Sequence, residues 1–81
     1  MENMPKVITL ANNQYVIKIG NKLIFQSYET TMAFADIITK EVILHNDANC
    51  YTRMTSKYLN RFLKEYCGIN DRKECKYNNL N

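Results

Sequence analysis

The chain has 81 residues, of which 46% are hydrophobic and 23% charged, and its formal net charge is +3 at pH 7. This length suits one small domain, and the hydrophobic share argues against a disordered chain. No run approaches the ~20 apolar residues of a membrane-spanning helix. The N-terminus has an acidic residue and only a short apolar run, so we expect no secretory signal. We predict one domain over residues 1–75 and a frayed polar tail at 76–81.

The three cysteines, Cys50, Cys67 and Cys75, form no CxxC pair, which favours free thiols in a reducing, cytoplasmic compartment. A catalytic pair of Cys50 and the single histidine, His45, with Asp47 as its orienting group, would lie in a loop. The spacing of the histidine and the cysteines also differs from that of the usual zinc sites. We therefore predict no enzyme, no metal and no cofactor.

The first half of the chain begins with the pattern of an antiparallel β-meander. Residues 6–10 are a candidate edge strand, and Asn12-Asn13 is its turn. Residues 15–19 and 22–27 each alternate in side-chain type, with the period of a strand. The Gly20-Asn21 pair between them tolerates positive φ at both positions, which favours a tight hairpin.

The next segment allows two interpretations. Residues 30–37 alternate larger side chains with alanine, which indicates a further strand. A helix over 30–39 is the alternative, because the stretch has few β-branched residues. Thr39-Lys40 is the expected turn, and residues 41–45 form the expected strand after it.

The second half is dominated by one amphipathic helix, from residue 52 to about residue 67. Thr52 is its expected N-cap and Gly68 its expected C-terminal stop. Asn70 or Asp71 is expected to cap one further short turn. At about 100° per residue, one side of the helix is apolar: Tyr51, Thr55, Tyr58, Leu59, Phe62, Leu63 and Tyr66.

These elements combine into an α+β fold, an antiparallel β-meander of three to five strands packed against one principal C-terminal helix (about 52–67). A sheet with one helix is the smallest assembly that buries both apolar stripes. The edge strand at 6–10 is also able to pair with its copy, which leaves a homodimer open.

The other side of the helix holds the candidate partner-binding residues. They lie within an arc of about 100°: Arg53, Lys57, Asn60, Arg61 and Lys64. The pairs Arg53/Lys57 and Lys57/Arg61 carry like charges four residues apart, and each costs a helix about 0.2–0.5 kcal/mol. Such a tolerated repulsion favours an anionic partner, a protein or a nucleic acid. The alternative is a solvated face that binds nothing.

Two sequence runs, NKLIFQSYET (21–30) and YTRMTSKYLNRFLKEYCGI (51–69), resemble a family of short bacteriophage and prophage proteins of unknown function. Met54 stands where that family has Thr or Ser. The resemblance implies a phage-like origin and a meander-plus-helix fold, and it assigns no catalytic residue. The matching residues are Tyr51, Thr52, Arg53, Thr55, Ser56, Lys57, Tyr58, Phe62 and Leu63.

The functional hypothesis is a small non-enzymatic, phage-encoded protein that binds a host protein in the bacterial cytoplasm and uses no membrane. Its sharper form is an inhibitor of a host defence system, as anti-CRISPR proteins are. The alternative is a nucleic-acid-binding or transcription-modulating accessory protein that places the basic side of the helix on phosphates. A small enzyme ranks last.

Overall fold

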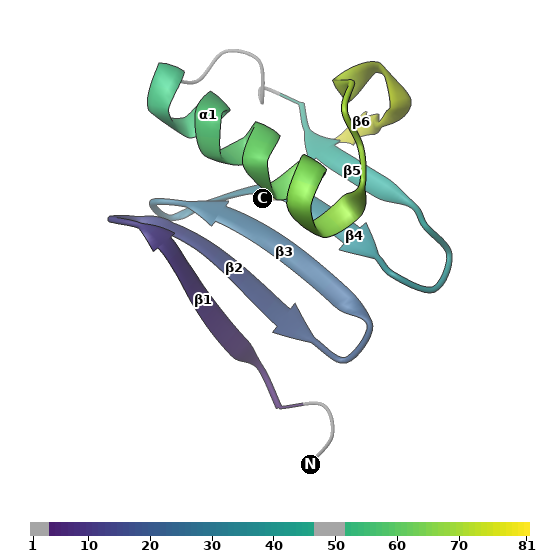
Figure 1. The fold of residues 1–81 in the computed structure, drawn as a ribbon, viewed down its shortest axis with the longest axis horizontal. Coiled ribbons are helices and arrows are strands. Elements are labelled where there is room, and N and C mark those ends of the chain that lie inside the picture. Colours follow the sequence, from purple (N-terminus) through teal and green to yellow (C-terminus); the bar gives the residue numbers. More distant parts are fainter. Residues whose placement is uncertain (1–3, 47–51) are drawn as a thin grey trace.

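A computed structural model describes residues 4–46 and 52–81. The chain forms two layers, a six-stranded sheet and one helix that lies across one face of it (Figure 1). The predicted α+β class and the single principal helix are confirmed. Within the described residues, no helix is long and apolar enough to cross a membrane.

The strands follow one another across the sheet in chain order, and the first five are antiparallel neighbours. This arrangement is the predicted meander. The segment with two interpretations is a strand and not a helix, because it pairs with strands on both sides. The strands are β1 (Lys6–Ala11), β2 (Gln14–Ile19), β3 (Lys22–Ser27), β4 (Thr30–Asp36), β5 (Val42–His45) and β6 (Lys76–Asn78).

The last strand corrects the prediction of a frayed tail at 76–81. β6 pairs in parallel with β5, so the sheet has one strand more than the predicted range. Beyond β6, the Leu80 amide donates to Nδ1 of His45 at 3.2 Å. The Asn81 side chain accepts from the backbone amide of Thr31 at 2.9 Å and donates to its carbonyl at 3.1 Å. Backbone hydrogen bonds need no apolar side chains, so composition did not reveal this strand.

The β2–β3 turn lies at Gly20-Asn21 as predicted, with one difference in its backbone. Gly20 has a φ of 57°, whereas Asn21 is not among the described residues with positive φ. A left-handed first central residue alone is the pattern of a type II′ turn, in which glycine avoids the clash that a Cβ would make. The expectation of positive φ at both positions is therefore wrong. In the β1–β2 turn, Asn13 has a φ of 62°, which Asn tolerates better than most residues.

The helix begins and ends where the sequence predicted. α1 (Arg53–Phe62) starts after Thr52, whose Oγ1 accepts from the Thr55 amide at 3.2 Å. It continues as a wider π-helical turn, η2 (Leu63–Cys67), and stops at Gly68, which has a φ of 70°. Glycine adopts this left-handed conformation without steric cost, so it ends the helix.

The predicted short turn after the helix is a 3₁₀ turn, η3 (Arg72–Glu74). Asp71 caps it, because its Oδ1 accepts from the Lys73 amide at 2.9 Å. The chain then enters β6 directly. This compact connection brings the segment after the helix back beside β5.

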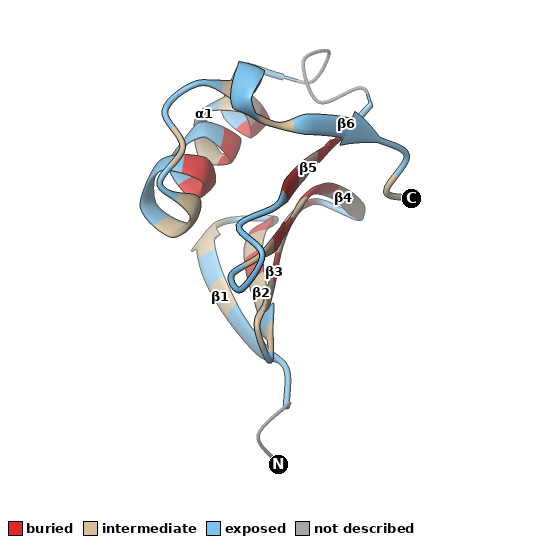
Figure 2. Ribbon diagram, turned by 90° about the vertical axis from the view of Figure 1, so that its right-hand side faces the viewer, coloured by how far each residue is buried: buried red, intermediate tan, exposed pale blue. Residues whose placement is uncertain are grey.

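The core lies between the helix and the face of the sheet beneath it, and Figure 2 shows the buried residues of α1 turned towards the sheet. The four buried helix residues all belong to the predicted apolar stripe: Thr55, Leu59, Phe62 and Leu63. The sheet contributes mainly alternate residues of its central strands, as the pleat favours. The exception is the adjacent pair Met32 and Ala33, which lies where the β3–β4 register shifts. The buried apolar residues of the sheet are Val16, Leu23, Phe25, Met32, Ala33, Ala35, Val42 and Leu44.

Candidate partner-binding face

The predicted binding residues lie on the side of the helix that faces away from the sheet. All five are exposed, while the stripe on the opposite side is buried or half-buried. The two-sided helix is therefore confirmed, and the binding role remains a prediction. Tyr51, also placed on the apolar stripe, lies outside the described residues. The exposed residues, named here the basic helix face, are Arg53, Lys57, Asn60, Arg61 and Lys64.

Two cations of the basic helix face have contacts within the helix. Arg61 Nε lies 3.2 Å from Glu65 Oε2. Both side chains are about half exposed, so the pair contributes only about 0.3–0.5 kcal/mol. Lys57 Nζ lies 5.6 Å from the centroid of the Tyr58 ring, within reach of a cation–π contact. Neither contact buries the cation, so both side chains stay accessible to a partner.

Arg72 joins the basic helix face from another element. Its Nε donates to Oδ1 of Asn60 at 2.9 Å, and its Nη2 donates to the Ser56 carbonyl at 3.2 Å. It therefore adds a guanidinium beside the helix and engages the one uncharged member of the face. Sequence reasoning missed Arg72 because its sequence separation from Asn60 is twelve residues. The only local signal was its position directly after the cap Asp71.

Contacts between the helix and the sheet hold the basic helix face in its orientation. Near the N-terminal end of α1, the hydroxyls of Thr55 and Ser27 lie 3.0 Å apart in the buried interface. Further along, the ring of Phe62 stacks on that of Phe25. At the C-terminal end, Ile69 packs against the core. These contacts fix the rotation of the helix about its axis, and so they determine which side chains face outward.

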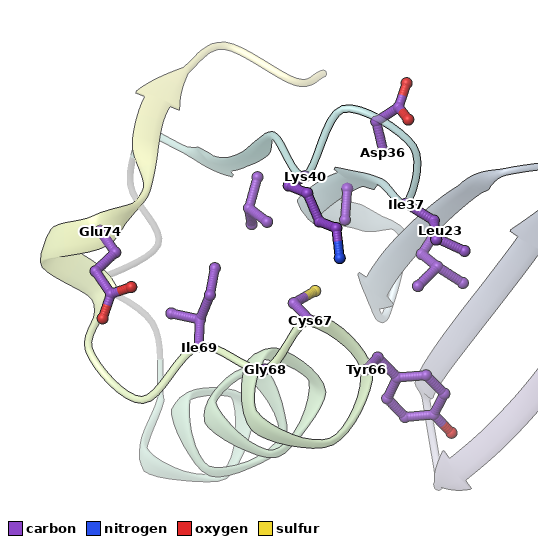
Figure 3. Close-up of a pocket in the computed structure, with 11 residues that line it drawn as sticks. Leu23, Asp36, Ile37, Lys40, Tyr66, Cys67, Gly68, Ile69 and Glu74 are labelled. Carbon is purple, nitrogen blue, oxygen red and sulfur yellow. The ribbon is translucent and has the colours of Figure 1, made fainter.

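A cavity of about 340 Å³ lies beside the C-terminal end of the helix (Figure 3). Its walls combine apolar and polar groups and include Ile69. The Lys40 ammonium and the Cys67 thiol point into it, and Glu74 lies across from them. Burial and, to a smaller extent, the neighbouring Cys75 raise the pKa of the Cys67 thiol to about 11. The thiol therefore stays protonated at neutral pH, which makes it a poor nucleophile.

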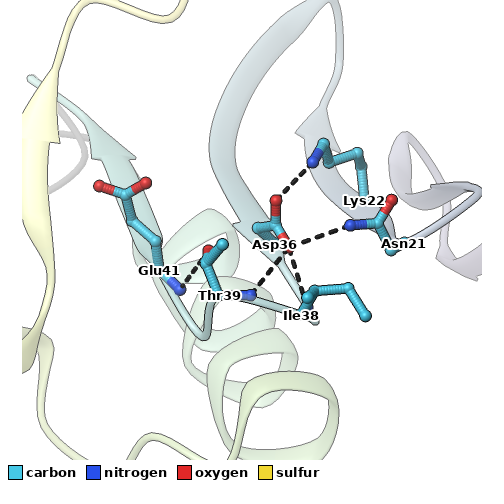
Figure 4. A network of polar contacts seen from close by, with 6 residues as sticks. All are labelled: Asn21, Lys22, Asp36, Ile38, Thr39 and Glu41. Carbon is cyan, nitrogen blue, oxygen red and sulfur yellow. Dashed lines mark hydrogen bonds and ion pairs between the residues drawn. The ribbon is translucent and has the colours of Figure 1, made fainter.

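The Asp36 carboxylate, which lines this cavity, joins two turns through hydrogen bonds (Figure 4). Asp36 accepts from the Lys22 ammonium, from Nδ2 of Asn21 at 3.1 Å, and from the backbone amides of Ile38 at 2.9 Å and Thr39 at 3.1 Å. The hydrogen bond from Lys22 is the main cause that lowers the pKa of Asp36 to about 2. These bonds fasten the β4–β5 turn to the β2–β3 turn.

The sequence also raised a Cys–His catalytic pair and a metal site. Nδ1 of His45 accepts from a backbone amide, and Asp47 and Cys50, its proposed catalytic partners, lie outside the described residues. Cys67 and Cys75 are free cysteines, as predicted. Among the residues that the structure describes, no group of three or more His, Cys, Asp or Glu is placed to hold a metal ion.

Comparison with known proteins gives one relationship. A protein family of unknown function, DUF8033, matches residues 1–78. No curated protein and no solved structure matches the chain. The family match includes both runs that carried the resemblance and extends through β6. A match over nearly the whole chain shows that the protein belongs to the family of unknown function DUF8033.

Proposed function

We propose that this protein is a small non-enzymatic binding protein that contacts an anionic partner through the basic helix face. The observation that carries the proposal is the concentration of exposed cations on one side of α1 and η2, where Glu65 is the one acidic residue. The repulsion between cations four residues apart opposes helix formation. Binding to a negative surface removes that repulsion, so the arrangement favours a partner.

The partner we propose is an acidic surface of another protein. Arg is enriched in protein–protein interfaces, and so is Met. Met54, next to Arg53, exposes 58% of its surface at the start of the helix. A helix face of this length, about 1.5 Å per residue, offers a continuous strip on which the contacts can form. An apolar residue beside cations suits a protein surface better than a phosphate backbone.

The biological setting in this proposal rests on the resemblance to phage and prophage proteins. We place the protein as phage-encoded and active in the cytoplasm of the bacterial host. Its sharper form is an inhibitor that covers a functional surface of a host defence protein, as anti-CRISPR proteins do. Blocking a surface requires a rigid contact face, and the buried attachment of α1 supports this form.

The second candidate function is binding of nucleic acid by the same face. The position of Arg72 favours it, because this guanidinium extends the cationic strip beyond the helix. If four cations each neutralise one phosphate of duplex DNA, the logarithm of the affinity falls with that of the salt concentration with a slope of about three to four. Contact with an acidic protein need not show such a slope.

The test compares two triple variants of the full chain. The first reverses charge on the basic helix face with Arg53→Glu, Lys57→Glu and Arg61→Glu. The matched control makes the same change in net charge elsewhere, with Lys6→Glu, Lys18→Glu and Lys73→Glu, all of which are exposed. We expect tagged wild type and the control to capture the same protein from bacterial lysate, and the helix variant to lose it. Equal capture by both variants contradicts the proposal.

A nuclease arm and a direct titration separate the two partners. Capture that survives nuclease treatment supports a protein partner. Anisotropy titrations with a short duplex DNA at about 50 and about 200 mM salt measure the phosphate contribution. Steep weakening with salt supports the second candidate, and no binding at the lower concentration excludes it. Thermal unfolding of each variant shows that the fold is kept.

A further inference from the structure

The cavity beside the C-terminal end of the helix has the size of a small-molecule site. Its volume of about 340 Å³ lies at the lower end of the range for ligand pockets, which combine apolar walls with a few well-placed polar groups. It lies between the end of η2, the β4–β5 turn and η3, and Figure 3 shows these segments around it. The cavity therefore suits a ligand of about ten non-hydrogen atoms.

One part of the cavity wall is apolar. Leu23, Ala35 and Val42 contribute it from the sheet, and all three are buried. Ile69 adds a side chain from the segment after the helix. A ligand group that contacts these residues leaves water, which favours binding in proportion to the apolar area removed from water. This part of the wall therefore suits a short aliphatic group.

Three charged residues line the cavity, and one of them is already engaged. Asp36 accepts hydrogen bonds from Lys22, Asn21 and two backbone amides. The Lys40 ammonium and the Glu74 carboxylate have no hydrogen-bond or ion-pair partner among the residues that the structure describes. They carry opposite charges and line one cavity, but they do not pair with each other. A ligand with one charge of each sign would engage both.

Lys40 occupies a backbone position that lysine does not favour. It lies in the β4–β5 turn with a φ of 66°, in the left-handed region that glycine and asparagine adopt more readily. From this position its ammonium points into the cavity, on the same side as the Cys67 thiol (Figure 3). Turn geometry alone would favour glycine or asparagine here, which supports a separate use for the lysine side chain.

A second, more open hollow of about 400 Å³ borders the cavity and determines which way a ligand would lie. It shares Lys40, Val42 and Glu74 with the cavity. Its other lining residues are polar, and two of them, Glu41 and Lys76, already pair at 3.3 Å. The two unpaired charges thus lie between an apolar wall on one side and a polar hollow on the other. A ligand with a charged end and an aliphatic end matches this arrangement.

We propose that this cavity binds a free amino acid with an aliphatic side chain. Lys40 binds its carboxylate and Glu74 binds its ammonium. Its side chain packs against Leu23, Val42 and Ile69. Hydrogen bonds between charged groups are stronger than those between neutral ones, and the two charged ends fix the orientation of the ligand. Because both charged residues are exposed, water screens these contacts and the affinity is modest.

This site is separate from the proposed partner-binding function. The basic helix face lies on the side of the helix that faces away from the sheet, and its charged residues do not line the cavity. The two proposals fail independently, because one depends on cations of the helix and the other on Lys40 and Glu74. Loss of partner capture therefore leaves the ligand site untouched, and the reverse also holds.

A titration of the full chain with L-leucine, followed in ¹H–¹⁵N spectra, tests the site. For a ligand of about nine non-hydrogen atoms we expect a dissociation constant of about 1 mM. The amides of Lys40, Cys67, Gly68 and Glu74 should shift and saturate. Free glycine has the same charged groups and no side chain, so it should bind at least about tenfold more weakly. No saturable shift of these amides up to about 50 mM L-leucine, or equal binding of free glycine, overturns the proposal.

Two analogues of L-leucine, each without one charged group, test the two contacts against matched variants. Isocaproate lacks the ammonium, and isoamylamine lacks the carboxylate. Lys40→Met should weaken binding of L-leucine and isocaproate about fivefold and leave isoamylamine unchanged. Glu74→Gln should weaken binding of L-leucine and isoamylamine about fivefold and leave isocaproate unchanged. A variant that only distorts the cavity would weaken all three ligands alike. That result, or no weakening by either variant, overturns the proposal.

Control variants make the same chemical changes away from the cavity. Lys6→Met and Glu29→Gln replace exposed residues that do not line it. Both should bind L-leucine as the wild type does, and thermal unfolding of all four variants shows that the fold is kept. Equal weakening by the controls would show that net charge governs binding rather than Lys40 and Glu74, and would also overturn the proposal.

Discussion

Phe25 of β3 and Phe62 of α1 stack with their ring centroids 5.7 Å apart and an interplanar angle of 25°. Both residues are fully buried. Phe62 also stacks on Tyr66, again with centroids 5.7 Å apart. This series of three rings joins the sheet to the single helix. The direction in which the basic helix face points therefore depends on aromatic packing in the core.

Replacement of the central ring should destabilise the fold strongly. We expect Phe62→Ala to lower the free energy of unfolding by about 3–5 kcal/mol, through lost burial and the cavity left behind. That loss is a large share of the roughly 5–15 kcal/mol usual for a domain. Urea unfolding measures it. The exposed neighbour serves as control: Lys64→Ala should change the value by less than about 0.5 kcal/mol. Similar small effects of both changes would contradict the role of the aromatic series.

Replacement of Gln14 should instead raise the free energy of unfolding. Its side chain is fully buried, and neither its Nε2 nor its Oε1 has a hydrogen-bond partner among the described residues. A buried amide without partners costs about 1–3 kcal/mol. Gln14→Met keeps the approximate shape and removes that cost, so we expect the free energy of unfolding to rise by about 1 kcal/mol or more.

A second glutamine controls this experiment. The Nε2 of Gln26 donates to the Tyr28 carbonyl at 2.8 Å, so Gln26→Met removes a hydrogen bond and should not stabilise the protein. Chemical unfolding of both variants under the same conditions gives the comparison. A loss of stability in Gln14→Met would mean that the amide has partners in solution, and would refute this account.

The lowered pKa of Asp36 predicts that the protein loses stability in acid. The pKa of its carboxyl is about 2 in the folded chain, below the ordinary value of 3.8. Folding therefore favours the charged form, and this contribution to stability is complete above pH 3.8. It is lost as the pH falls from 3.8 through about 2. Unfolding measured across this window should show a steeper decline for the wild type than for Asp36→Asn.

The control for removing a carboxylate from a turn is Asp71→Asn, which affects the cap of η3 instead. Its stability should fall in that window as the wild type's does, because Asp36 is still present. Parallel curves for wild type and Asp36→Asn would exclude a stabilising ion pair between Lys22 and Asp36.

The raised pKa of Cys67, whose thiol points into the cavity beside the helix, predicts slow alkylation of this thiol. Because the pKa of Cys67 is about 11 against an ordinary 9.0, the thiolate fraction at about pH 8 is about 100-fold lower than in an unfolded chain. We expect iodoacetamide to modify Cys67 far more slowly in the native protein than in urea, as measured by peptide mass mapping. Burial also raises the pKa of Cys75, so it should be slowed as well. Equal native and unfolded rates at Cys67 would show that the thiol is open to solvent.

Local signals were sufficient for most of the fold. The cap at Thr52 and the stop at Gly68 were both correct, because each depends on interactions within a few residues. The strands expected at 6–10, 15–19, 22–27 and 41–45 were also correct, since the period of a strand shows in any short segment. The segment from residue 30 was left open between a strand and a helix, and its pairing decided for the strand. The positive φ expected at Asn21 was wrong. Both types of tight turn accept a Gly-Asn pair and both suit the twist of the joined strands, so the pair alone does not decide between them.

The features that the sequence did not predict depend on contacts between residues far apart in the chain. The Arg72 side chain reaches Asn60 only because η3 folds back beside α1. A row of apolar residues opposite the helix extends over five strands, and each strand contributes one of them: Val7, Ile17, Ile24, Phe34 and Ile43. Each register that aligns these residues depends on a different turn. Sequence patterns within one segment do not carry that information.

By itself the sequence determined that one helix separates cations from apolar residues, and that a β-meander precedes it. Helix periodicity and turn chemistry are properties of short segments, so they can be read without a structure. Only the tertiary structure decided that 76–78 completes the sheet, that Arg72 joins the basic helix face, and that the apolar row opposite the helix is continuous. These features require segments far apart in the chain to meet, and that meeting is set by how the whole core packs.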